Sequence, residues 1–474
     1  MKKYIFLFIT LVLLGTSCSD EFNQKPSFSL PGDESIKDLA TLNTAINGVY
    51  GTLVDRWGFA GDAALYADAK GGDVQMIDKS ANHFQPVIIF QTDRASGLSI
   101  GAYQVFSFTL ARVNSILENA ENVKDKDSNK ALFNDYMGQL YALRALAHFE
   151  MARLFAQIPS ISSDVNAPNS GIVINDKLYP FNTKFKRSTL KQTYDFIIAD
   201  FKKSMDLLSK DKKEASGKLN YWSVEALLSR TYLYAGDYSN SLKHAANVIA
   251  GSPYKLYEAK DYITVWKKTG TSESLFEILT TDKSNAQRNS LGYYTNPDGY
   301  PECAASNEFK TWILAQNSDI RSKSIREKAT AKGANKGYYT IKYEGQEGAS
   351  APLYVNNFKV IRLSEVYLIA AEAKLRGGND SAAKEAVWYY NELRKNRISD
   401  YNNAASVTLE NILDERRMEL FCENHRMFDL VRFKKDILSP IFDKPLKYDD
   451  YRLLTAIPER EINISPELAQ NPKW

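Results

Sequence analysis

The stretch Leu233-Tyr234-Ala235-Gly236-Asp237 ends one amphipathic segment, and Ser241-Leu242-Lys243-His244-Ala245 begins the next. The same order recurs 141 residues later, where Lys374-Leu375-Arg376-Gly377 precedes Ala382-Ala383-Lys384-Glu385-Ala386. Glycine readily adopts the left-handed conformation that ends a helix, and alanine lets the following helix pack closely. We therefore predict two helix–turn–helix pairs, one at each position.

Elsewhere, apolar residues recur every three or four positions, which is typical of amphipathic helices. One stripe runs from Thr189 to Leu208, and Thr189 with Gln192 fits a capping box at its start. Similar stripes occupy residues 36–54, 102–120, 132–158, 222–235 and 363–375. Paired helices with Gly-Asp turns and spaced alanines resemble tetratricopeptide units. The predicted fold class is mainly α: tetratricopeptide-like helix pairs form a scaffold with long irregular loop insertions and a few short strands.

Three polar, turn-rich insertions separate the helical stretches, at about residues 58–99, 159–187 and 252–348. The last one contains two strand-like pieces, at residues 274–279 and 338–343. Loops longer than about 12–15 residues in a compact domain are usually functional. We therefore expect residues 32–474 to form a single helical domain whose insertions provide the working surface.

The first 17 residues predict a signal peptide. Lys2 and Lys3 precede an apolar run that is too short to span a bilayer. The run ends in Leu14-Gly15-Thr16-Ser17-Cys18, which resembles the lipobox of bacterial lipoproteins. That resemblance implies cleavage before Cys18 and acylation of its sulfur, with residues 18–31 as a flexible lipidated tether. The alternative is an ordinary secretory signal with an incidental cysteine.

The residues after Cys18, Ser19-Asp20-Glu21, are acidic. They resemble the short tag that sends lipoproteins to the outer leaflet in Bacteroides-like bacteria. Covalent acyl chains hold a protein domain at a membrane surface without spanning the bilayer. We therefore expect a lipid-anchored protein exposed on the surface of the outer membrane.

Net charge and cysteine count limit the kinds of partner and covalent cross-link that we expect. Without residues 1–17 the chain has 58 basic and 57 acidic side chains, whereas nucleic-acid binding usually needs a basic face. Besides Cys18 the chain contains only Cys303 and Cys422. A disulfide between them would need an oxidising compartment, and we favour two separate thiols. We predict no nucleic-acid partner.

A charged block near the C-terminus reads Leu413-Asp414-Glu415-Arg416-Arg417-Met418-Glu419-Leu420-Phe421, then Glu423-Asn424-His425-Arg426-Met427-Phe428-Asp429-Leu430-Val431-Arg432-Phe433. Opposite charges three residues apart can pair along a helix, as Arg416 can with Glu419 and Glu423 with Arg426. From Glu415 to Arg426, three carboxylates and three arginines are interleaved. We therefore interpret the block as helical, with structural ion pairs that tie helices together, rather than as a polyanion-binding arginine cluster.

Several motifs together resemble the SusD/RagB family. The charged block is similar to its "ERR-x-EL-x-x-E-x-x-R-x-x-DL-x-R" motif, and residues 362–373 are similar to "R-x-x-E-v-x-L-x-x-A-E-A". Residues 457–474 resemble its "IP…QNPGY" ending, with Ser465 and Lys473-Trp474 as departures. Residues 143–159 resemble its "LRA…P" helix. The matches occur in order from Cys18 to the last residue.

The resemblance implies a lipid-anchored helical protein that lies over a SusC-like TonB-dependent transporter of the outer membrane. Such a protein captures oligosaccharides, or in some cases peptides, and delivers them to the transporter. The resemblance implies no enzymatic activity and no cofactor.

Sugar rings present apolar C–H faces edged by hydroxyl groups, so a glycan-binding protein needs flat aromatic side chains with hydrogen-bonding groups nearby. Two segments offer this mixture, and the resemblance implies ligand recognition by loops from these two general regions without assigning individual residues. The predicted ligand-binding candidates are Trp57, Tyr66, Asp68, Asp73 and Arg94 in the first region, and Tyr293, Tyr294, Asn296, Tyr300 and Trp312 in the second.

The sequence offers little for metal or catalytic chemistry. The four histidines, His83, His148, His244 and His425, stand at no metal-ligand spacing. No zinc-protease, phosphate-loop, nucleophile-elbow or dinucleotide-binding motif occurs. A calcium site could draw on Asp62, Asp68, Asp73 and Asp78, but their spacing differs from that of an EF-hand loop. We expect solvated loop acids and no metal site.

Three alternatives to glycan capture remain open. The same architecture could bind peptides through hydrogen bonding and charge. A protein-only helical scaffold would instead present a concave apolar groove without a small-ligand pocket. A surface glycosidase would need two juxtaposed carboxylates in a cleft.

Overall fold

The apolar stripes form helices, and the mainly α fold class is confirmed. The computed structural model describes residues 36–78, 82–180, 182–211 and 217–474; the predicted signal peptide, Cys18 and the tether lie outside these residues. The longer helices of the described part are α3 (Leu39–Thr52), α6 (Gly97–Asn119), α7 (Lys130–Phe155), α8 (Leu190–Leu207), α9 (Tyr221–Ala235), α10 (Tyr238–Gly251) and α13 (Leu363–Leu375). The shorter ones are α4 (Asp62–Lys70), α5 (Gln85–Ile88), α11 (Leu291–Tyr294), α12 (Asn307–Leu314), α14 (Ala386–Lys395), α15 (Leu409–Glu419), α16 (Arg426–Arg432) and α17 (Glu459–Ile464).

Side-chain caps begin several of these helices. The capping box predicted at α8 is confirmed, because Thr189 accepts the backbone N–H of Gln192 and Gln192 caps the backbone N–H of Thr189. Asp38 and Asn220 do the same at the starts of α3 and α9. Each cap satisfies backbone donors that have no partner inside the helix.

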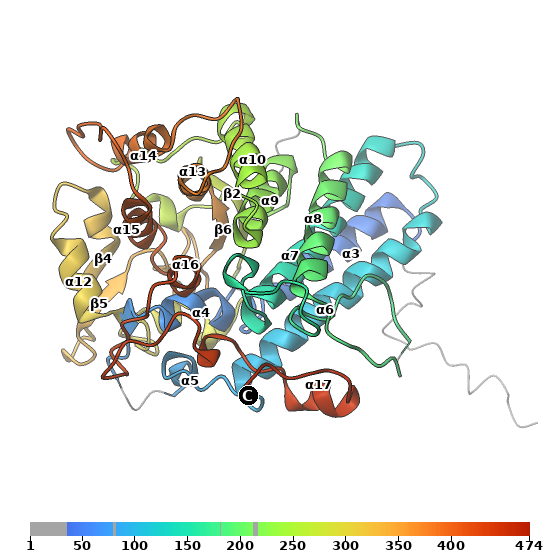
Figure 1. The fold of residues 1–474 in the computed structure, drawn as a ribbon, viewed down its shortest axis with the longest axis horizontal. Coiled ribbons are helices and arrows are strands. Elements are labelled where there is room, and N and C mark those ends of the chain that lie inside the picture. The colour runs from blue at the N-terminus through green and yellow to red at the C-terminus, as the bar shows by residue number, and fades with distance from the viewer. Residues whose placement is uncertain (1–35, 79–81, 181, 212–216) are drawn as a thin grey trace, which may run out of the picture.

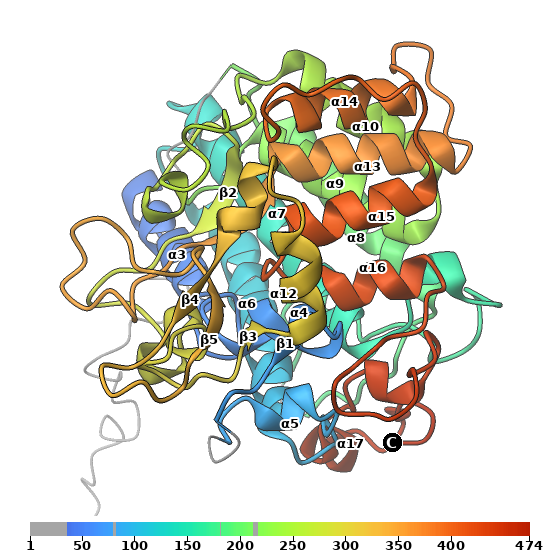
Figure 2. The ribbon, with the colours of Figure 1, turned by 90° about the vertical axis from the view of Figure 1, so that its left-hand side faces the viewer.

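Successive helices pack against one another in one continuous row. α6 packs on α7, α7 on α8, α8 on α9 and α9 on α10. The row then continues from α10 to α13 and from α13 to α14 and α15, although residues 252–362 separate α10 from α13. Figure 2 shows α14, α13, α15 and α16 as stacked rods on the side opposite the strands. The long insertion therefore interrupts the helical row in sequence and leaves it continuous in space (Figure 1).

The first predicted helix–turn–helix pair forms as expected. Gly236 ends α9 with φ +84°, in the left-handed conformation, and α10 follows directly. In the second pair Gly377 has φ +92°. The second helix, however, begins at Ala386 rather than near Ala382, because Asp380 Oδ1 accepts the backbone N–H of Ala382 and holds a turn there.

The strands are few and short. The described residues contain three two-stranded antiparallel sheets. Their strands pair β1 (Val74–Gln75) with β3 (Ala304–Ala305), β2 (Ser274–Ile278) with β6 (Phe358–Arg362), and β4 (Ile325–Lys328) with β5 (Gly337–Thr340). Single 3-10 turns are η2 (Ala120–Asn122), η3 (Pro159–Ile161), η4 (Val265–Lys267), η5 (Gln287–Asn289), η6 (Ile320–Ser324) and η7 (Tyr451–Leu453). Both strand-like pieces predicted in the third insertion are confirmed.

The first insertion differs from its prediction. Residues 58–99 were expected to form a polar excursion, but they include α4, whose nine residues are all buried. Polar side chains enter the interior here because they serve backbone groups of another segment. Asp68 accepts the N–H groups of Cys422 and Asn424 at 2.9 and 2.7 Å, and the side-chain oxygen of Asn424 accepts the N–H of Ala67.

The charged block is not one helix. α15 ends at Glu419, Cys422 and Asn424 adopt positive φ angles, and α16 begins at Arg426. The pairings predicted within the block, Arg416 with Glu419 and Glu423 with Arg426, are wrong. The break removes the helical spacing between Glu423 and Arg426, whereas Arg416 and Glu419 share α15 but bind partners on other elements.

The ion pairs of the block instead join separate elements. Glu419 contacts Arg321, Arg362 and Arg397, at 2.9–3.0 Å. Arg416 pairs with Asp429 at 2.8 Å, and Glu423 pairs with Arg362 at 2.8 Å. The interpretation of these charges as structural ion pairs between elements is confirmed.

One hydrophobic cluster extends from Ile36 to Leu468, and a smaller one surrounds Trp266. Cys303 and Cys422 are both buried free thiols, which confirms the prediction of two separate thiols. Within the described ranges, no helix is both long and apolar enough to span a bilayer.

Candidate functional site

Four rings gather on the side of the molecule that carries the third insertion. His83 stacks on Tyr300 with centroids 3.8 Å apart and planes 15° apart. Tyr293 meets Tyr300 edge-on at 5.0 Å and lies 5.6 Å from the ring of Tyr354. Each of these side chains keeps part of its surface exposed. We call His83, Tyr293, Tyr300 and Tyr354 the aromatic cluster.

A closed turn sets the spacing of the two central rings. The backbone N–H of Tyr300 donates to the carbonyl oxygen of Tyr293 at 2.7 Å. A Cβ atom on Gly299 would lie 2.2 Å from that same oxygen, so only glycine fits the turn. Asn296 closes the tip by accepting the N–H of Asp298 at 3.0 Å. The turn therefore brings Tyr293 and Tyr300 into contact although six residues separate them in the chain.

Tyr294 holds the turn against the protein interior. Its ring is fully buried and stacks on Phe84, and its hydroxyl donates to Asp62 Oδ1 at 2.9 Å. Burial raises the pKa of Asp62 to about 7, against the opposing effect of Arg56. The backbone N–H groups of His83 and Phe84 donate to Glu302 at 3.1 and 2.8 Å. Both carboxylates beneath the cluster are thus engaged in holding its segments in place.

Cationic side chains border the aromatic cluster. Arg288 is exposed, and a hydrogen bond to Tyr354 together with the neighbouring Tyr293 and Tyr300 raises its pKa. Burial and the nearby Arg56 both lower the pKa of His83. The cluster can therefore offer ring faces and edges for stacking, with guanidinium and phenol groups beside them for hydrogen bonds.

The structure brings three of the ten predicted candidates together. Tyr293 and Tyr300 belong to the aromatic cluster, and Asn296 lies half-buried at the tip of the turn between them. Their neighbours His83 and Tyr354 were not predicted, because no short-range pattern links residues so far apart in the chain. The one signal in the sequence that could have indicated Tyr354 was the number of tyrosines in the insertions.

Four candidates need correction, because they are buried and already hold protein partners: Tyr66, Asp68, Asp73 and Tyr294. The hydroxyl of Tyr66 donates to the carbonyl oxygen of Leu453 at 2.8 Å. Asp73 pairs with Arg417 and Arg426. The expectation of solvated loop acids is wrong for Asp62, Asp68 and Asp73, because all three side chains are buried. Their charge serves internal hydrogen bonds.

The other three candidates, Trp57, Trp312 and Arg94, lie outside the aromatic cluster. The ring faces of the two tryptophans are partly covered by other side chains. Arg56 lies 3.8 Å above the ring of Trp57, and the backbone of α6 at Gly101 approaches the same ring closely. Trp312 packs against Phe309 and carries Arg417 over its ring. Arg94 is exposed and lies 3.8 Å from Glu459, near α17.

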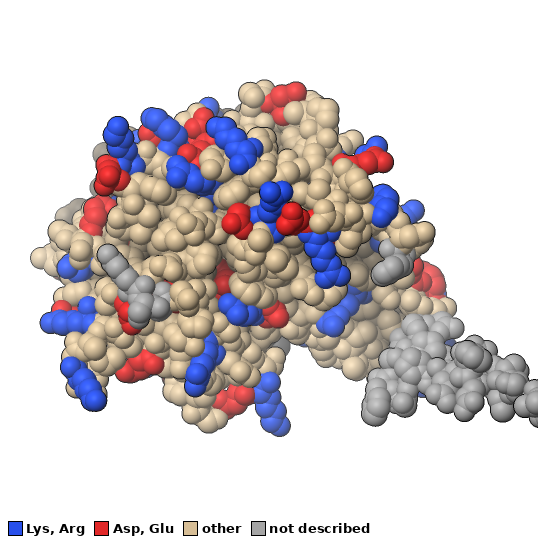
Figure 3. Space-filling view, turned by 90° about the horizontal axis from the view of Figure 1, so that it is seen from below, with Lys and Arg blue, Asp and Glu red and all other residues tan. Residues whose placement is uncertain are grey.

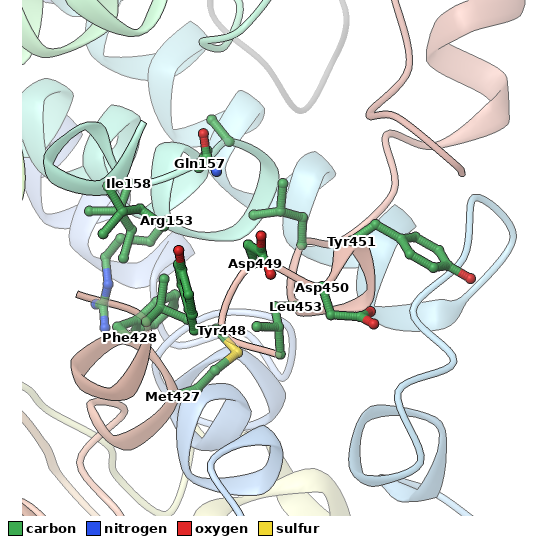
Figure 4. Close-up of a pocket in the computed structure, with 14 residues that line it drawn as sticks. Arg153, Gln157, Ile158, Met427, Phe428, Tyr448, Asp449, Asp450, Tyr451 and Leu453 are labelled. Atoms are coloured by element: carbon green, nitrogen blue, oxygen red, sulfur yellow. The ribbon is translucent and has the colours of Figure 1, made fainter. Parts of the chain in front are cut away.

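A separate hollow of about 60 Å³ lies between the end of α7, α16 and η7. Figure 4 shows Phe428, Tyr448 and Arg153 together on one side of it and the ring of Tyr451 extending away. Ligand pockets usually measure about 300–1,000 Å³, and a water molecule occupies about 30 Å³ of liquid. This hollow is therefore too small for a sugar ring.

Charges of both signs are interspersed on the face that carries α5 and α17, with uncharged surface between them (Figure 3). Nucleic-acid-binding surfaces usually concentrate basic residues on one face. This face does not have that character.

Two family profiles match the sequence. One, described as the SusD family, covers residues 187–474, and another, described as starch-binding associating with outer membrane, covers residues 80–233. The first profile alone spans more than half of the chain.

The chain belongs to the SusD family.

Relatives and solved structures agree with this assignment. The SusD-family chain is 25% identical to SusD-like protein P2 of Formosa agariphila, covering 98% of this chain and 99% of that one. It is 22% identical to a SusD-like protein of Bacteroides ovatus, covering 91% and 82%. A SusD superfamily protein from Bacteroides vulgatus superposes with a TM-score of 0.84 at 29% identity, covering 93% and 100%. A laminarin binding SusD-like protein shares the fold, with a TM-score of 0.73 at 20% identity and coverage of 92% and 100%.

These matches confirm the family resemblance and the fold class that the SusD-like motifs predicted. The family description associates such proteins with the outer membrane.

Proposed function

We propose that this chain is a lipid-anchored, surface-exposed protein that captures oligosaccharides and delivers them to a SusC-like TonB-dependent transporter. The observation that carries the binding step is the aromatic cluster, in which rings from three distant segments meet on one partly exposed surface. Aromatic rings can stack on the apolar C–H faces of sugars, and neighbouring polar groups can orient the hydroxyl groups.

The relatives support a glycan ligand over other small molecules. One structural neighbour is described as laminarin binding, and one matching profile is described as starch-binding. A peptide would draw on backbone-type hydrogen bonding more than on stacked rings, so the aromatic cluster favours a glycan.

The anchoring and delivery steps rest on the N-terminal sequence and on the family. Leu14-Gly15-Thr16-Ser17-Cys18 supplies an acylation site, and an acyl chain holds a folded domain at a membrane surface. Metabolic labelling with a palmitate analogue tests this step. Labelling that disappears in Cys18→Ala supports acylation of Cys18. Equal labelling of the unmodified protein and the variant contradicts it.

Isothermal calorimetry of the chain without residues 1–18, against panels of oligosaccharides and short peptides, tests the binding step. We expect saturable binding to one sugar class with no release of reducing ends. Tyr300→Ala should weaken it at least about tenfold, the equivalent of about 1.4 kcal/mol. Tyr179→Ala is the matched control, because Tyr179 is a half-buried tyrosine in another insertion, where it packs on Phe185.

Each other outcome identifies a different function. Binding to peptides alone would replace the glycan by a peptide ligand. New reducing ends would indicate a glycosidase, and no binding to either panel would favour a protein-only scaffold.

A further inference from the structure

A polar hollow adjoins the turn that carries the aromatic cluster. It measures about 390 Å³ and opens to solvent. Its wall on one side is the tip of the turn, with Asn296, Pro297 and Asp298. The rest of its lining comes from η4, from β4 with the residue that follows it, and from the segment after β5: Lys267, Arg326, Lys328, Ala329 and Glu344.

Three cationic side chains in this hollow share one carboxylate. Arg326 Nη2 and Lys328 Nζ each lie 2.6 Å from the same oxygen of Glu344, and Lys267 Nζ lies 3.7 Å from the other. The Glu344 side chain is 8% exposed, whereas those of Arg326 and Lys267 are 57% and 45% exposed. One buried carboxylate cannot neutralise three cations. Asp298, at the exposed rim, still leaves one positive charge in excess.

Partial burial of Lys328 strengthens the interaction of this excess charge with a ligand. Lys328 is largely buried, and burial lowers its pKa although the nearby Glu344 raises it. A charged group withdrawn from water interacts more strongly with an incoming charge of opposite sign than a solvated one does. The hollow therefore favours an anion.

Positive charge is also present beside the aromatic cluster, which the same turn carries. Arg288 contacts the phenol of Tyr354, and Arg56 lies close enough to His83 to lower its pKa. The Asn335 side chain, from the β4–β5 connection, donates to the carbonyl oxygen of Pro297 at 3.3 Å. This bond ties the β4–β5 connection to the tip of the turn, and that one turn both lines the hollow and carries Tyr293 and Tyr300.

We propose that the ligand is an acidic oligosaccharide, whose carboxylate or sulfate group is held by Lys267, Arg326 and Lys328 while a neighbouring sugar ring lies on the aromatic cluster. This inference rests on the proposed glycan-binding function. Guanidinium and ammonium groups bind carboxylate and sulfate oxygens through charge-assisted hydrogen bonds.

The test compares pairs of sugars that differ only in charge, using calorimetry on the chain without residues 1–18. One pair is an oligogalacturonate and its methyl ester, which keeps the ring skeleton and removes the carboxylates. The other is a sulfated galactan oligosaccharide and its desulfated form. The two pairs distinguish a carboxylate from a sulfate as the recognised group. We expect one acidic sugar to bind roughly tenfold or more tightly than its neutral partner, with an advantage that shrinks as salt screens the charges.

Two double variants assign that advantage to the hollow. Lys267→Ala with Arg326→Ala removes the two exposed cations and should abolish the preference for the acidic sugar. Lys332→Ala with Lys336→Ala is the matched control, because it removes two exposed lysines from the connection between β4 and β5, outside the hollow. The control should keep the preference of the unmodified chain.

Failure of this inference is distinguishable from failure of the proposed function. Equal affinity for acidic and neutral sugars, with both weakened by Tyr300→Ala, would overturn the acidic ligand and leave glycan binding intact. A preference that both double variants reduce equally would overturn the role of the hollow. Absence of binding to any of these sugars and to the wider oligosaccharide panel would overturn both.

Discussion

Arg362 and Glu419 form an ion pair that has no solvent-exposed side-chain surface. Arg362 Nη1 lies 2.9 Å from Glu419 Oε1, and both side chains are 0% exposed. Arg362 also contacts Glu273 and Glu423, and Glu419 also contacts Arg321 and Arg397. The pair therefore joins β6 and the end of α15 within a wider buried network.

Replacing one member of this network should be costly. Glu419→Gln leaves its arginine partners with too little negative charge, and breaking a buried pair costs about 3–5 kcal/mol. Urea unfolding measures this change as a fall in the free energy of unfolding. The control is Lys191→Ala, which removes an exposed pair with Asp195 and should cost about 1 kcal/mol or less. Equal losses in the two variants would contradict a structural role for the network.

The same carboxylate makes stability sensitive to acid. Burial by itself raises the pKa of Glu419, but Arg397, Arg362 and Arg321 outweigh it and hold this pKa well below its ordinary value. Because the folded pKa lies below the unfolded value of about 4.3, the stabilisation is complete above that pH and is lost as the pH falls through the folded pKa. The urea concentration at the unfolding midpoint should therefore fall as the pH is lowered below about 5. In Glu419→Gln this fall should be smaller. An identical pH profile in the variant would rule out this contribution of Glu419.

Two helical glycines should respond oppositely to alanine. A Cβ atom on Gly48, in α3, meets nothing within 4 Å, so Gly48→Ala should raise stability by up to about 1 kcal/mol. On Gly101, in α6, it would lie 2.2 Å from the Trp57 ring, and overpacking costs about 1–3 kcal/mol. Thermal unfolding of both variants measures the difference. A tolerated Gly101→Ala would mean that Trp57 can leave its place against α6.

The two internal thiols should react only after unfolding. Cys303 and Cys422 are 1% and 0% exposed, and burial raises the pKa of both thiols. In the chain without residues 1–18, a thiol reagent such as DTNB should modify neither cysteine in the native protein and both in denaturant. Rapid modification of the native protein would show that the interior around α4 opens readily.

Tyr354 tests the part of the aromatic cluster that the sequence did not reveal. Tyr354→Ala should weaken binding of the recognised glycan by roughly tenfold, since a ring contact is lost. Tyr354→Phe keeps the ring and removes only the hydroxyl that contacts Arg288, so its loss should be smaller. Calorimetry of both variants separates stacking from hydrogen bonding. Unchanged affinity in Tyr354→Ala would restrict the site to Tyr293, Tyr300 and His83.

Local features of the fold were predictable because their causes lie within a few residues. The apolar stripe and capping box of α8 and the turn at Gly236 each depend on neighbours along the chain. The interpretation of the charged block as structural was correct, but its pairings were wrong. The helix breaks between Glu419 and Arg426, and Arg416 pairs with Asp429 across that break. Helix continuity depended on partners such as Asp68, which comes from a distant segment.

The sequence by itself determined the helical class, the helix pairs and the family motifs, because periodicity, caps and turns act over one or two helical turns. Only the tertiary structure decided that Tyr294 faces inward while Tyr293 joins His83 and Tyr354 at the surface. It also decided that α10 packs on α13 across a long insertion. Those contacts depend on which distant segments fold together, and no spacing within either segment encodes its partner.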